Sequence, residues 1–505
     1  MDHLLLAAAA AFTPIAIGAV GLGTLIGLIF GSIPGLTFTV ALALALPITF
    51  GMDAVPATGL LLGTYIGGMT GGSVSAILLG IPGTPSAAAT VLDGYPLTRQ
   101  GRASIALGTA VIVSTIGGIF SLIVMMVSVN LVSQVAIKFG PAEIFALVLF
   151  GMSTICGLAS GSMLKGLIAG VIGLMVMTIG IDTIDGVNRL TFGSINMLQG
   201  VNLLVAMIGL FAVPFIIETF ARHSRGTTEV NRTGSLRAEL PGIRLLARNS
   251  WLIARCSAIG TVIGAIPGTG GAIAAFLAYD NAKRFSPTPE RFGKGAIEGV
   301  IAPETANNAV TGGTLIPLLS LGIPGSASPA TAIVLAGLMI HGITPGPALF
   351  MTSETEVYGI YIAVVMAYVF ILVLQLAGIR LFVYVLRVPP QLLAVVILVL
   401  CVIGAYTVRN SAFDIYTMAV IGGLAYGLMR MGIPTTPVIL GMVLGPTLEN
   451  EFRTAMALSD GHYSIFYTSP VAMGFFALAA LIIALQTASG LRLRKTTKLT
   501  EKSNA

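Results

Sequence analysis

Charged side chains are scarce in this sequence, and their scarcity defines the class of protein. Asp, Glu, Lys and Arg make up 9% of the 505 residues, while hydrophobic residues make up 55%. Soluble domains carry about 25% charged residues, so this chain has too few charges to cover a surface that faces water. We therefore expect an integral membrane protein with many spans.

Cysteine is also scarce, and the motifs of several enzyme classes are missing. The three cysteines lie in separate apolar stretches, with neither a metal-type spacing nor a disulfide framework. The sequence has no phosphate-binding loop of the Gly-x-x-x-x-Gly-Lys-[Ser/Thr] type, no His-Glu-x-x-His and no Gly-x-Ser-x-Gly. We expect a protein that is not an enzyme, does not hydrolyse ATP and carries no cofactor.

Acidic residues are fewer than basic ones, which gives a net charge of +6. The Lys and Arg residues cluster in short loops and in the run Arg492-Leu493-Arg494-Lys495, as the positive-inside rule predicts for cytoplasmic segments. The sequence has no contiguous basic run with interleaved aromatic residues. This pattern argues against nucleic-acid binding.

What the sequence has in abundance is apolar stretches. A helix needs about 20 apolar residues to cross a bilayer, and the stretches predict an all-α polytopic fold with about 12 transmembrane segments. A polar stretch rich in arginine separates two groups of them. We predict a first transmembrane repeat over 1–221, a basic cytoplasmic linker over 222–255, a second repeat over 256–488 and a basic cytoplasmic tail over 489–505.

The two halves carry the same motifs in the same order. Pro34-Gly35 recurs as Pro267-Gly268, Thr70-Gly71-Gly72-Ser73 as Thr311-Gly312-Gly313-Thr314, and Gly80-Ile81-Pro82-Gly83 as Gly322-Ile323-Pro324-Gly325. The offsets of 233, 241 and 242 positions nearly agree. This agreement indicates an internal duplication.

Loop charge predicts how the two halves are oriented. The first segment compared lies between the Pro-Gly motif and the Thr-Gly-Gly motif of each half. In the second half it has the basic residues Lys283, Arg284, Arg291 and Lys294, while in the first half its loop 49–53 has no Lys or Arg. After the third motif the asymmetry reverses, since the first half has Arg99 and Arg102 and the second half has no Lys or Arg over 341–356. Corresponding loops therefore prefer opposite sides of the membrane, which is typical of inverted-topology repeats.

The Pro-Gly breaks are the candidate substrate site. Within a bilayer, broken backbone is tolerated only where it is buried in protein or lines a polar cavity, and paired breaks in two halves point to a binding site. A helix that resumes after a break offers free N–H groups and its positive end to an anion. We predict substrate contacts, including hydroxyl contacts to a carboxylate, from Pro34, Gly35, Gly83, Thr84, Ser86, Gly268, Thr269, Gly325, Ser326 and Ser328.

The polar residues before each Gly-Ile-Pro-Gly motif are the candidate ion site. Glu304, Asn307 and Asn308 lie in consecutive turns of an apolar segment, where polar groups are costly to bury without partners. Hard cations prefer carbonyl, amide and hydroxyl oxygens. We predict a Na⁺ site made by Thr70, Gly71, Ser73, Asn307, Asn308 and Thr311. Glu304 either holds an adjacent helix end or carries a proton, and the sequence leaves both open.

A weaker version of the break motif occurs late in the chain, at Gly432-Ile433-Pro434-Thr435-Thr436-Pro437. It predicts one more broken helix. A structural role and a functional role are equally compatible with it.

These motifs together resemble the large permease subunit of the tripartite tricarboxylate transporters. The segments that carry the resemblance are Gly27–Leu36, Gly80–Pro85, Pro303–Ala309, Leu321–Gly325 and Leu444-Gly445-Pro446 with Glu449. The resemblance implies a secondary transporter of the bacterial inner membrane that takes up citrate or related carboxylates with a cation, commonly Na⁺. It also implies two partners, a small four-span membrane subunit and a periplasmic solute-binding protein.

Other functional interpretations are also compatible with the sequence. An ion channel with paired re-entrant loops would use the same breaks as a filter, and a related carboxylate transporter would work without a binding protein. An intramembrane enzyme would need a nucleophile–base pair, which these motifs lack. In each half we predict a re-entrant hairpin, with its tip at Pro82–Ser86 in the first half and at Pro324–Ser328 in the second. A carrier would move either by rocking or by vertical displacement of a domain that carries both hairpins, and the hairpins favour displacement by analogy.

Overall fold

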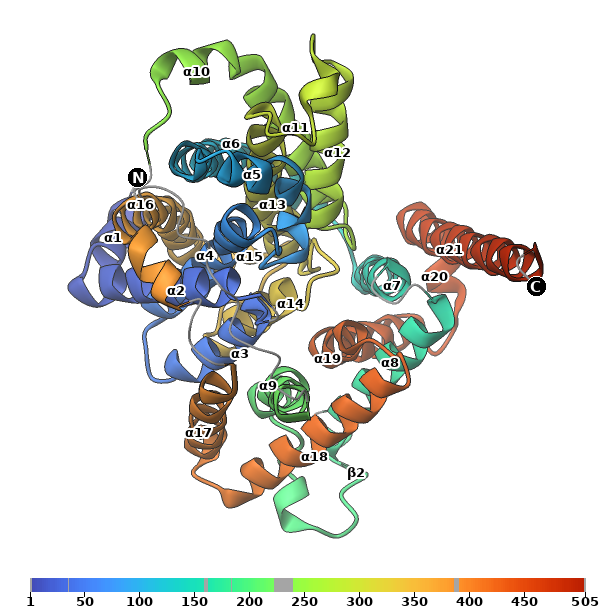
Figure 1. The fold of residues 1–505 in the computed structure, drawn as a ribbon. Coiled ribbons are helices and arrows are strands. Elements are labelled where there is room, and N and C mark those ends of the chain that lie inside the picture. The colour runs from blue at the N-terminus through green and yellow to red at the C-terminus, as the bar shows by residue number, and fades with distance from the viewer. Residues whose placement is uncertain are drawn as a thin grey trace.

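The computed structural model describes residues 2–34, 36–158, 162–182, 184–221, 239–385 and 390–503. Most residues in these ranges are helical and they contain one two-stranded hairpin, so the predicted all-α class is confirmed (Figure 1). Eight of the helices are long and apolar enough to cross a membrane, and five shorter apolar helices accompany them. The number of about 12 spans and the four-part division of the chain stay predictions.

One group of helices, here called the core bundle, interleaves both halves of the sequence. It contains α1 (Asp2–Ala11), α2 (Pro14–Ser32), α3 (Phe38–Ile48), α4 (Ala54–Leu79), α5 (Ala88–Arg99), α6 (Ala103–Ala136), α11 (Ser250–Ala265), α12 (Gly271–Arg284), α13 (Glu298–Leu321), α14 (Pro329–Ile340) and α16 (Glu354–Val385). Within each half, α2 packs on α4 and α11 packs on α13. Between the halves the packing is crossed, because α6 lies against α13 and α16 lies against α4.

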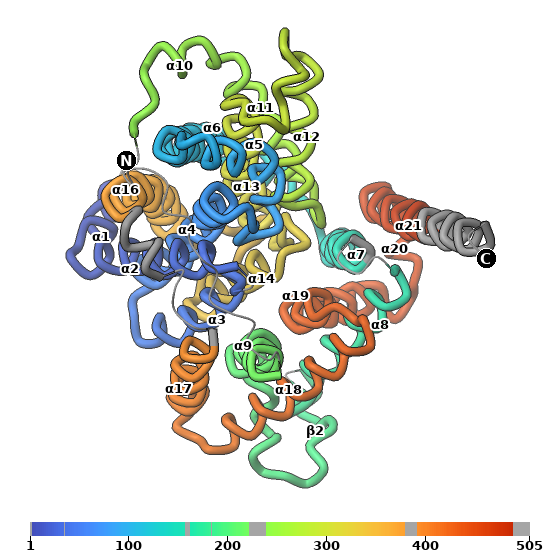
Figure 2. The backbone as a smooth tube through the Cα atoms, viewed as in Figure 1, coloured from blue at the N-terminus to red at the C-terminus, as the bar shows by residue number. Residues whose placement is uncertain are grey.

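The remaining long helices form a second group, here called the outer bundle. It contains α7 (Pro141–Leu158), α8 (Met163–Met177), α9 (Leu203–Ala221), α17 (Pro390–Arg409), α18 (Ala412–Arg430), α19 (Thr435–Leu458) and α21 (Pro470–Ser503). Here α9 packs on α17 and α18, while α19 packs on α7 and α8. Figure 2 shows α21 beside α7 and directed away from the rest of the molecule. The two bundles meet mainly through α3 and α14.

Glycine permits the closest helix packing in the core bundle. Gly23, Gly27 and Gly31 follow one another at intervals of four along α2, and an added Cβ atom at each would lie 2.1–2.3 Å from a carbonyl oxygen of α4. No side chain fits at that distance, so these glycines bring the two backbones into contact. The Gly-x-x-x-Gly pattern of the first half is therefore a packing face.

The two Gly-Ile-Pro-Gly motifs terminate their helices in the same way. Gly80 ends α4 with φ +70°, and Gly322 ends α13 with φ +69°. This left-handed conformation is a common helix stop that glycine adopts without steric cost.

The last glycine of each motif packs against the end of an earlier helix. An added Cβ atom at Gly83 would lie 2.1 Å from the carbonyl oxygen of Gly31, and one at Gly325 would lie 2.9 Å from that of Gly264. Gly31 and Gly264 occupy equivalent places in the two sequence repeats. The duplicated motifs thus make equivalent local contacts.

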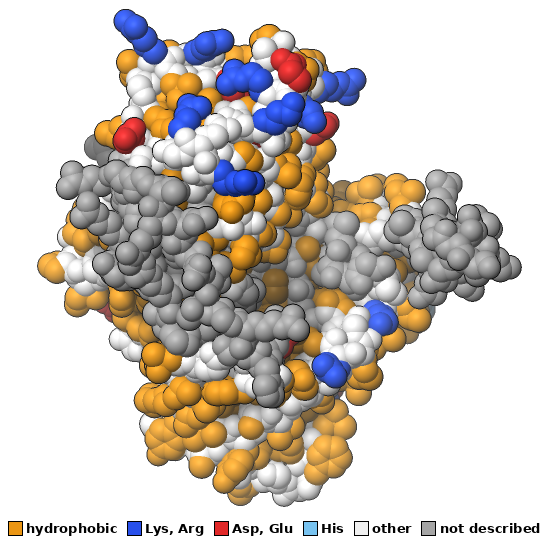
Figure 3. Space-filling view, viewed as in Figure 1, with side chains coloured by type: hydrophobic (Ala, Val, Ile, Leu, Met, Phe, Trp, Pro, Cys, Tyr) orange, Lys and Arg blue, Asp and Glu red, His pale blue; other side chains and the backbone are white. Residues whose placement is uncertain are grey.

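Basic side chains gather at one end of the core bundle, over α10 (Ile243–Arg248), the end of α12 and the loop before α13 (Figure 3). The exposed members are Arg99, Arg102, Arg244, Arg248, Lys283, Arg284, Arg291 and Lys294. The second-half loop residues and the first-half residues of the loop-charge pattern therefore share one face, and the cytoplasmic location that the positive-inside rule predicts for it stays a prediction. Residues 222–238 of the predicted linker and the side chains of the predicted tail lie outside the described residues.

A charged cluster fastens the only strand pair of the described residues, β1 (Gly180–Ile181) and β2 (Asn188–Arg189), to the distal half of α19. Arg189 Nη1 lies 2.7 Å from Glu449 Oε1, and Arg453 Nη1 lies 2.9 Å from Asp182 Oδ2. The N–H of Ile184 also donates to Asp182 at 2.8 Å. These backbone and guanidinium donors lower the pKa of Asp182 from its ordinary value.

The cluster predicts a pH-dependent contribution to stability. A carboxyl whose pKa is lowered by folding stabilises the protein above its unfolded pKa, and this contribution is lost as the pH falls through the folded pKa. We expect Arg453→Met to lower the melting temperature of the purified protein by a few degrees at neutral pH and by less in acid, where Asp182 is protonated. The exposed Arg291→Met is the control. Equal losses for Arg453→Met at both pH values would contradict the prediction.

Candidate functional site

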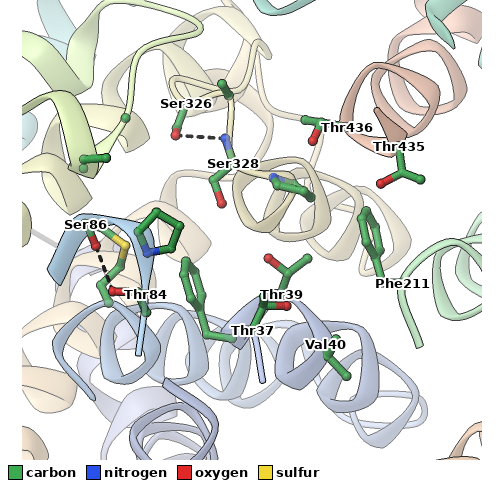
Figure 4. A pocket seen from close by; sticks show the side chains of 18 of the residues that line it. Thr37, Thr39, Val40, Thr84, Ser86, Phe211, Ser326, Ser328, Thr435 and Thr436 are labelled. Carbon is green, nitrogen blue, oxygen red and sulfur yellow. Dashed lines mark hydrogen bonds between the residues drawn. The ribbon is translucent and has the colours of Figure 1, made fainter. Parts of the chain in front are cut away.

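A cavity of about 660 Å³ lies where the core and outer bundles meet (Figure 4). Residues 83–86 of the first predicted hairpin tip form one wall, and residues 326–328 of the second tip form another together with Pro329. The outer bundle closes it with α9, including Phe211, and with the start of α19. The two tips that the sequence placed at one site do line one cavity.

Several helices begin at the wall of this cavity. The first residues of α3, α12, α14 and α19 line it, as does the 3-10 turn Pro85–Ala87 that leads into α5. The first N–H groups of a helix have no partner inside that helix. Ser328 Oγ accepts from the N–H of Ala330 at 3.4 Å and so caps α14. The N-cap Thr37 of α3 makes no such bond, and the N-caps of α12 and α19, Gly270 and Pro434, have no side-chain acceptor.

The positive ends of four α-helices therefore point at one space. Each contributes the equivalent of about half a positive charge at its N-terminus. Uncapped N–H groups in this position are donors for the oxygens of an anion.

Small hydroxyl side chains supply further donors. Figure 4 shows Thr84 and Ser86 on one side of the cavity and Ser326 and Ser328 on another, with Thr37 and Thr39 below them and Thr435 and Thr436 on the side of Phe211. Among the described residues that line it, Glu218 carries the one formal charge, and no Lys, Arg or His is among them. An anion in this cavity would be held by backbone N–H groups and hydroxyls.

The predicted substrate residues are mostly found at this cavity. Those that line it are Gly83, Thr84, Ser86, Gly268, Thr269, Ser326 and Ser328. Pro34 and Gly325 are not among the lining residues, and Gly325 packs instead against Thr314. Gly35 lies outside the described residues. The N–H of Ala327 donates to the carbonyl oxygen of Thr269 at 2.8 Å, which joins the second tip to the Pro-Gly break of the same half.

Among the predicted ion ligands, Asn308 is at the centre of a buried hydrogen-bond network. Its Oδ1 accepts from Thr70 Oγ1 at 2.7 Å, and its Nδ2 donates to Ser114 Oγ at 2.7 Å and to the carbonyl oxygen of Glu304 at 3.1 Å. The amide thus links α4, α6 and α13. Its oxygen already accepts from Thr70, so one of its two lone pairs is left for an ion.

Asn307 differs from its neighbour because its oxygen has no partner. Its Nδ2 donates to the carbonyl oxygen of Met69 at 3.1 Å, which leaves Oδ1 buried and unsatisfied. A Cβ atom added at Gly271 would lie 2.6 Å from this Oδ1 and 2.9 Å from the Cβ of Ser86. Both Gly271 and Ser86 line the cavity. Asn307 Oδ1 is therefore a buried acceptor directly behind the cavity wall.

The other predicted ion residues have local roles. Ser73 Oγ donates to the carbonyl oxygen of Thr70 at 2.8 Å, and Thr311 Oγ1 donates to that of Asn308 at 2.6 Å. Gly71 packs against the backbone of Leu28 on α2. In the described residues no cluster of three or more His, Cys, Asp or Glu side chains could hold a metal, so oxygen donors of other kinds would have to bind a cation.

Part of the cavity wall was not predicted from the sequence. Thr37 and Thr39 follow the first Pro-Gly break directly, so the break itself was the available signal. Thr435 and Thr436 belong to the late Gly-Ile-Pro motif, whose role the sequence left open, and both line the cavity. The sequence did not identify Phe211 as a cavity residue, because nothing in its apolar helix indicates which face meets the tips.

An all-helical chain with many apolar spans that encloses a cavity of helix N-termini and hydroxyls is a multi-pass membrane transport protein. The chain belongs to the tripartite tricarboxylate transporter TctA family, whose model matches residues 17–440. The resemblance found in the sequence motifs is thereby confirmed, and membership makes this chain a transport component of a multi-subunit tricarboxylate transporter.

Two relatives from Agrobacterium vitis are similar to it. One is described as an uncharacterized 52.8 kDa protein in the TAR-I ttuC' 3'region, and it is 37% identical over 487 residues, covering 96% of both chains. The other, described as an uncharacterized protein in the TAR-II ttuC' 3'region, is 37% identical over 236 residues, which cover 47% of this chain and 97% of the relative. No solved structure matches the chain.

Proposed function

We propose that this chain is the large permease subunit of a secondary transporter that takes up citrate or related di- and tricarboxylates across the bacterial inner membrane. Na⁺ is the proposed coupling ion. A periplasmic solute-binding protein delivers the substrate, and a small four-span membrane subunit completes the complex. The family to which the chain belongs supports the class of solute.

The observation that carries the proposal is the convergence of helix N-termini on one cavity without a basic side chain among its described lining residues. Carboxylate oxygens are acceptors only, and the cavity offers N–H and hydroxyl donors on several sides. Such a site binds an anion through dispersed partial charges, so the anion can leave again without breaking a strong ion pair.

The proposed Na⁺ site lies behind the same wall. Asn307 Oδ1 is the unsatisfied buried oxygen there. Ser86 lies on the other side of Gly271, and the Met69 carbonyl oxygen accepts from Asn307 Nδ2. A hard cation bound to these oxygens would place positive charge beside the carboxylate. Each ligand would then increase the affinity for the other, which is the requirement for symport.

A difference between the halves supports alternating access. Helix α3 packs on α9 and α17, and every residue from Phe38 to Leu46 is buried. The equivalent α12 makes no comparable contact with the described outer bundle, and Ile273, Phe276 and Leu277 are 44–47% exposed. In inverted repeats the second state exchanges these arrangements, so α12 would dock on the outer bundle while α3 separates from it.

This exchange can be tested by the accessibility of α12. The rate at which a maleimide labels the cysteine of a Phe276→Cys variant should fall during turnover, because α12 becomes covered. A constant labelling rate would contradict the exchange.

The experiment that tests the function is uptake into proteoliposomes. A panel of di- and tricarboxylates is offered with and without a Na⁺ gradient, the binding protein and the small subunit. Saturable uptake that needs both Na⁺ and the binding protein is the expected result. A flux that does not saturate and needs no soluble partner would instead indicate a channel.

A substitution in the cavity should separate binding from turnover. Thr37 is the N-cap of α3 and makes no capping bond with its side chain, so its hydroxyl is available to the substrate. We expect Thr37→Val to raise the KM for the carboxylate by about tenfold, the value of one hydrogen bond to a charged group, with little change in maximal rate. Thr407→Val on α17, away from the cavity, is the matched control. An unchanged KM would exclude Thr37 from the site.

A further inference from the structure

Another hollow, here called the basic pocket, lies at the end of the core bundle where basic side chains gather (Figure 3). It has a volume of about 340 Å³ and is lined by Gln100, Arg102, Glu290, Arg291, Lys294 and Gly295. The first two residues belong to the loop between α5 and α6, and the other four belong to the loop between α12 and α13. The pocket therefore joins loops of both sequence halves, and none of its residues lines the cavity at the hairpin tips.

Contacts between the two loops fix the backbone of the basic pocket. Gln100 Nε2 donates to the carbonyl oxygen of Lys294 at 2.8 Å. The N–H of Gly295 donates to Oδ1 of the buried Asp93 on α5, also at 2.8 Å. Phe292, which lies between the two cationic residues of the second loop, is 7% exposed and packs in the hydrophobic core. The loops are therefore preorganised, which lowers the entropic cost of binding a ligand between them.

The three cationic side chains of the pocket have no anionic partner among the described residues. Arg102, Arg291 and Lys294 are all exposed, and none of them forms an ion pair there, although Glu290 lines the same pocket. Arg102 is also the N-cap of the 34-residue helix α6, and its side chain makes no capping bond. The positive end of this helix adds to the charge of the three side chains. The pocket therefore attracts an anion.

The positive-inside rule explains why these loops are basic, but it does not explain why three of the charges surround one hollow. Like charges repel one another, so cations that only mark one side of the membrane gain nothing by converging. Arg99, Arg244 and Arg284 are exposed at the same end of the core bundle and do not line the basic pocket. The arrangement of Arg102, Arg291 and Lys294 therefore points to a ligand.

The donors of the basic pocket fit a phosphate group. Arginine presents a planar fork of N–H donors that matches phosphate oxygens, and lysine adds a compact charge. Basic pockets at the cytoplasmic ends of transmembrane helices are places where anionic lipid headgroups bind.

Exposed aromatic side chains at the same end agree with a position close to lipid headgroups. Trp251 in the first turn of α11 is 74% exposed, and Phe285, at the start of the loop that carries Arg291, is 64% exposed. Exposed aromatic residues of this kind are typical of the boundary between membrane and water.

We propose that the basic pocket binds a phosphate group of net negative charge through Arg102, Arg291 and Lys294. An anionic phospholipid headgroup and a free phosphate ion share this chemistry. A bound phosphate would bridge the two loops and strengthen the contact that Asp93 makes between α5 and the loop before α13. The inference concerns a different site from the cavity and does not rest on the proposed carboxylate transport.

The test is the melting temperature of the purified full chain in detergent, with phosphatidylglycerol, phosphatidylcholine, inorganic phosphate or citrate added at constant ionic strength. A ligand that binds the folded protein raises its melting temperature. We expect phosphatidylglycerol to raise it by a few degrees and phosphatidylcholine, whose headgroup has no net charge, to have little effect. In the double variant Arg102→Gln/Arg291→Gln the affinity should fall by at least about tenfold, because each arginine makes charge-assisted hydrogen bonds.

Two further variants separate the pocket from general effects of charge. Arg244→Gln/Arg284→Gln removes the same charge from the same end of the core bundle outside the pocket, so it should keep the wild-type shift. Glu290→Gln removes the one acidic side chain of the pocket and should increase the affinity, which is the opposite of what loss of stability would do. Glu290→Gln also provides the test if the pocket double variant does not fold.

The outcomes identify the source of the phosphate group or overturn the site. A shift with phosphatidylglycerol that the pocket variant loses and the control keeps would assign the pocket to a lipid headgroup, and the same pattern with inorganic phosphate would assign it to a soluble phosphate. Equal shifts in wild type, pocket variant and control, or no shift with either probe, would overturn the inference. An unchanged affinity in Glu290→Gln would also overturn it, as would a shift with citrate alone, because the pocket would then belong to the carboxylate.

Discussion

Replacing Gly83 with alanine is expected to abolish transport while the protein still inserts into the membrane. The new Cβ atom would lie 2.1 Å from the carbonyl oxygen of Gly31, 2.7 Å from Ser75 Oγ and 3.0 Å from the Cα of Gly72. Two of these neighbours are backbone atoms, so the tip itself has to move. Overpacking of this kind costs about 1–3 kcal/mol, which a large folded protein tolerates. The displaced tip carries Thr84 and Ser86 away from the cavity, and we expect uptake to fall by at least about tenfold.

Gly325→Ala should have the same effect in the second half. Its Cβ atom would lie 2.6 Å from both the Cα and the carbonyl oxygen of Thr314. Gly427→Ala is the matched control, because nothing lies within 4 Å of a Cβ atom there and alanine favours the helix. The measurement is the initial rate of carboxylate uptake per amount of reconstituted protein. Equal rates for Gly83→Ala and Gly427→Ala would show that the position of the tip does not control transport.

The cavity could be anticipated from the sequence because helix breaks are local events. A Pro-Gly pair inside an apolar stretch ends a helix whatever surrounds it, and the left-handed Gly80 and Gly322 stops follow from the same residues. Their duplication then indicated that the two tips meet. What the sequence could not indicate is the outer wall, since Phe211 and its neighbours are apolar residues in an apolar helix. Their contact with the tips depends on how two helix bundles pack.

The network around Asn308 illustrates the same limit at the level of single residues. The sequence alone does not distinguish two adjacent asparagines, yet on a helix their side chains point about 100° apart. Asn308 faces Thr70 and Ser114, whereas Asn307 faces Met69 and the cavity wall. Asp93 gave no signal at all, although its carboxylate ties α5 to the start of α13. Its partners include backbone N–H groups far along the chain, and no sequence pattern predicts such contacts.

The late Gly-Ile-Pro motif forms part of the cavity wall because of how the core and outer bundles pack together. Gly432 adopts φ +69° after α18, and α19 begins at Thr435 on the cavity wall. The other end of α19 carries Glu449 and Arg453, which hold the strand pair outside the helices. A single helix thus joins the cavity to an ion-pair cluster on the surface. A displacement of α19 during transport would therefore change both the cavity wall and the ion-pair cluster.

Asn308→Ala is expected to abolish Na⁺-coupled uptake while the protein still reaches the membrane. The substitution removes the bonds to Thr70, Ser114 and the Glu304 carbonyl at once. Thr70 Oγ1 also lies 3.0 Å from the Ile66 carbonyl oxygen and can donate its one proton there once Asn308 is removed, so this hydroxyl stays satisfied and we expect the fold to survive. The link between α4, α6 and α13 is lost, and with it the geometry that positions the neighbouring Asn307.

Asn307→Ala should act on the ion alone. It removes the unsatisfied Oδ1 and one bond to Met69, so we expect the Na⁺ concentration for half-maximal uptake to rise by about 10–100-fold, with carboxylate exchange retained at saturating Na⁺. Asn130→Ala on the exposed part of α6 is the control for both variants. If Asn307→Ala leaves the Na⁺ requirement unchanged, the ion does not bind behind the cavity wall. If Asn308→Ala also transports normally, neither amide belongs to the coupling site, and the cation must enter at another part of the carrier.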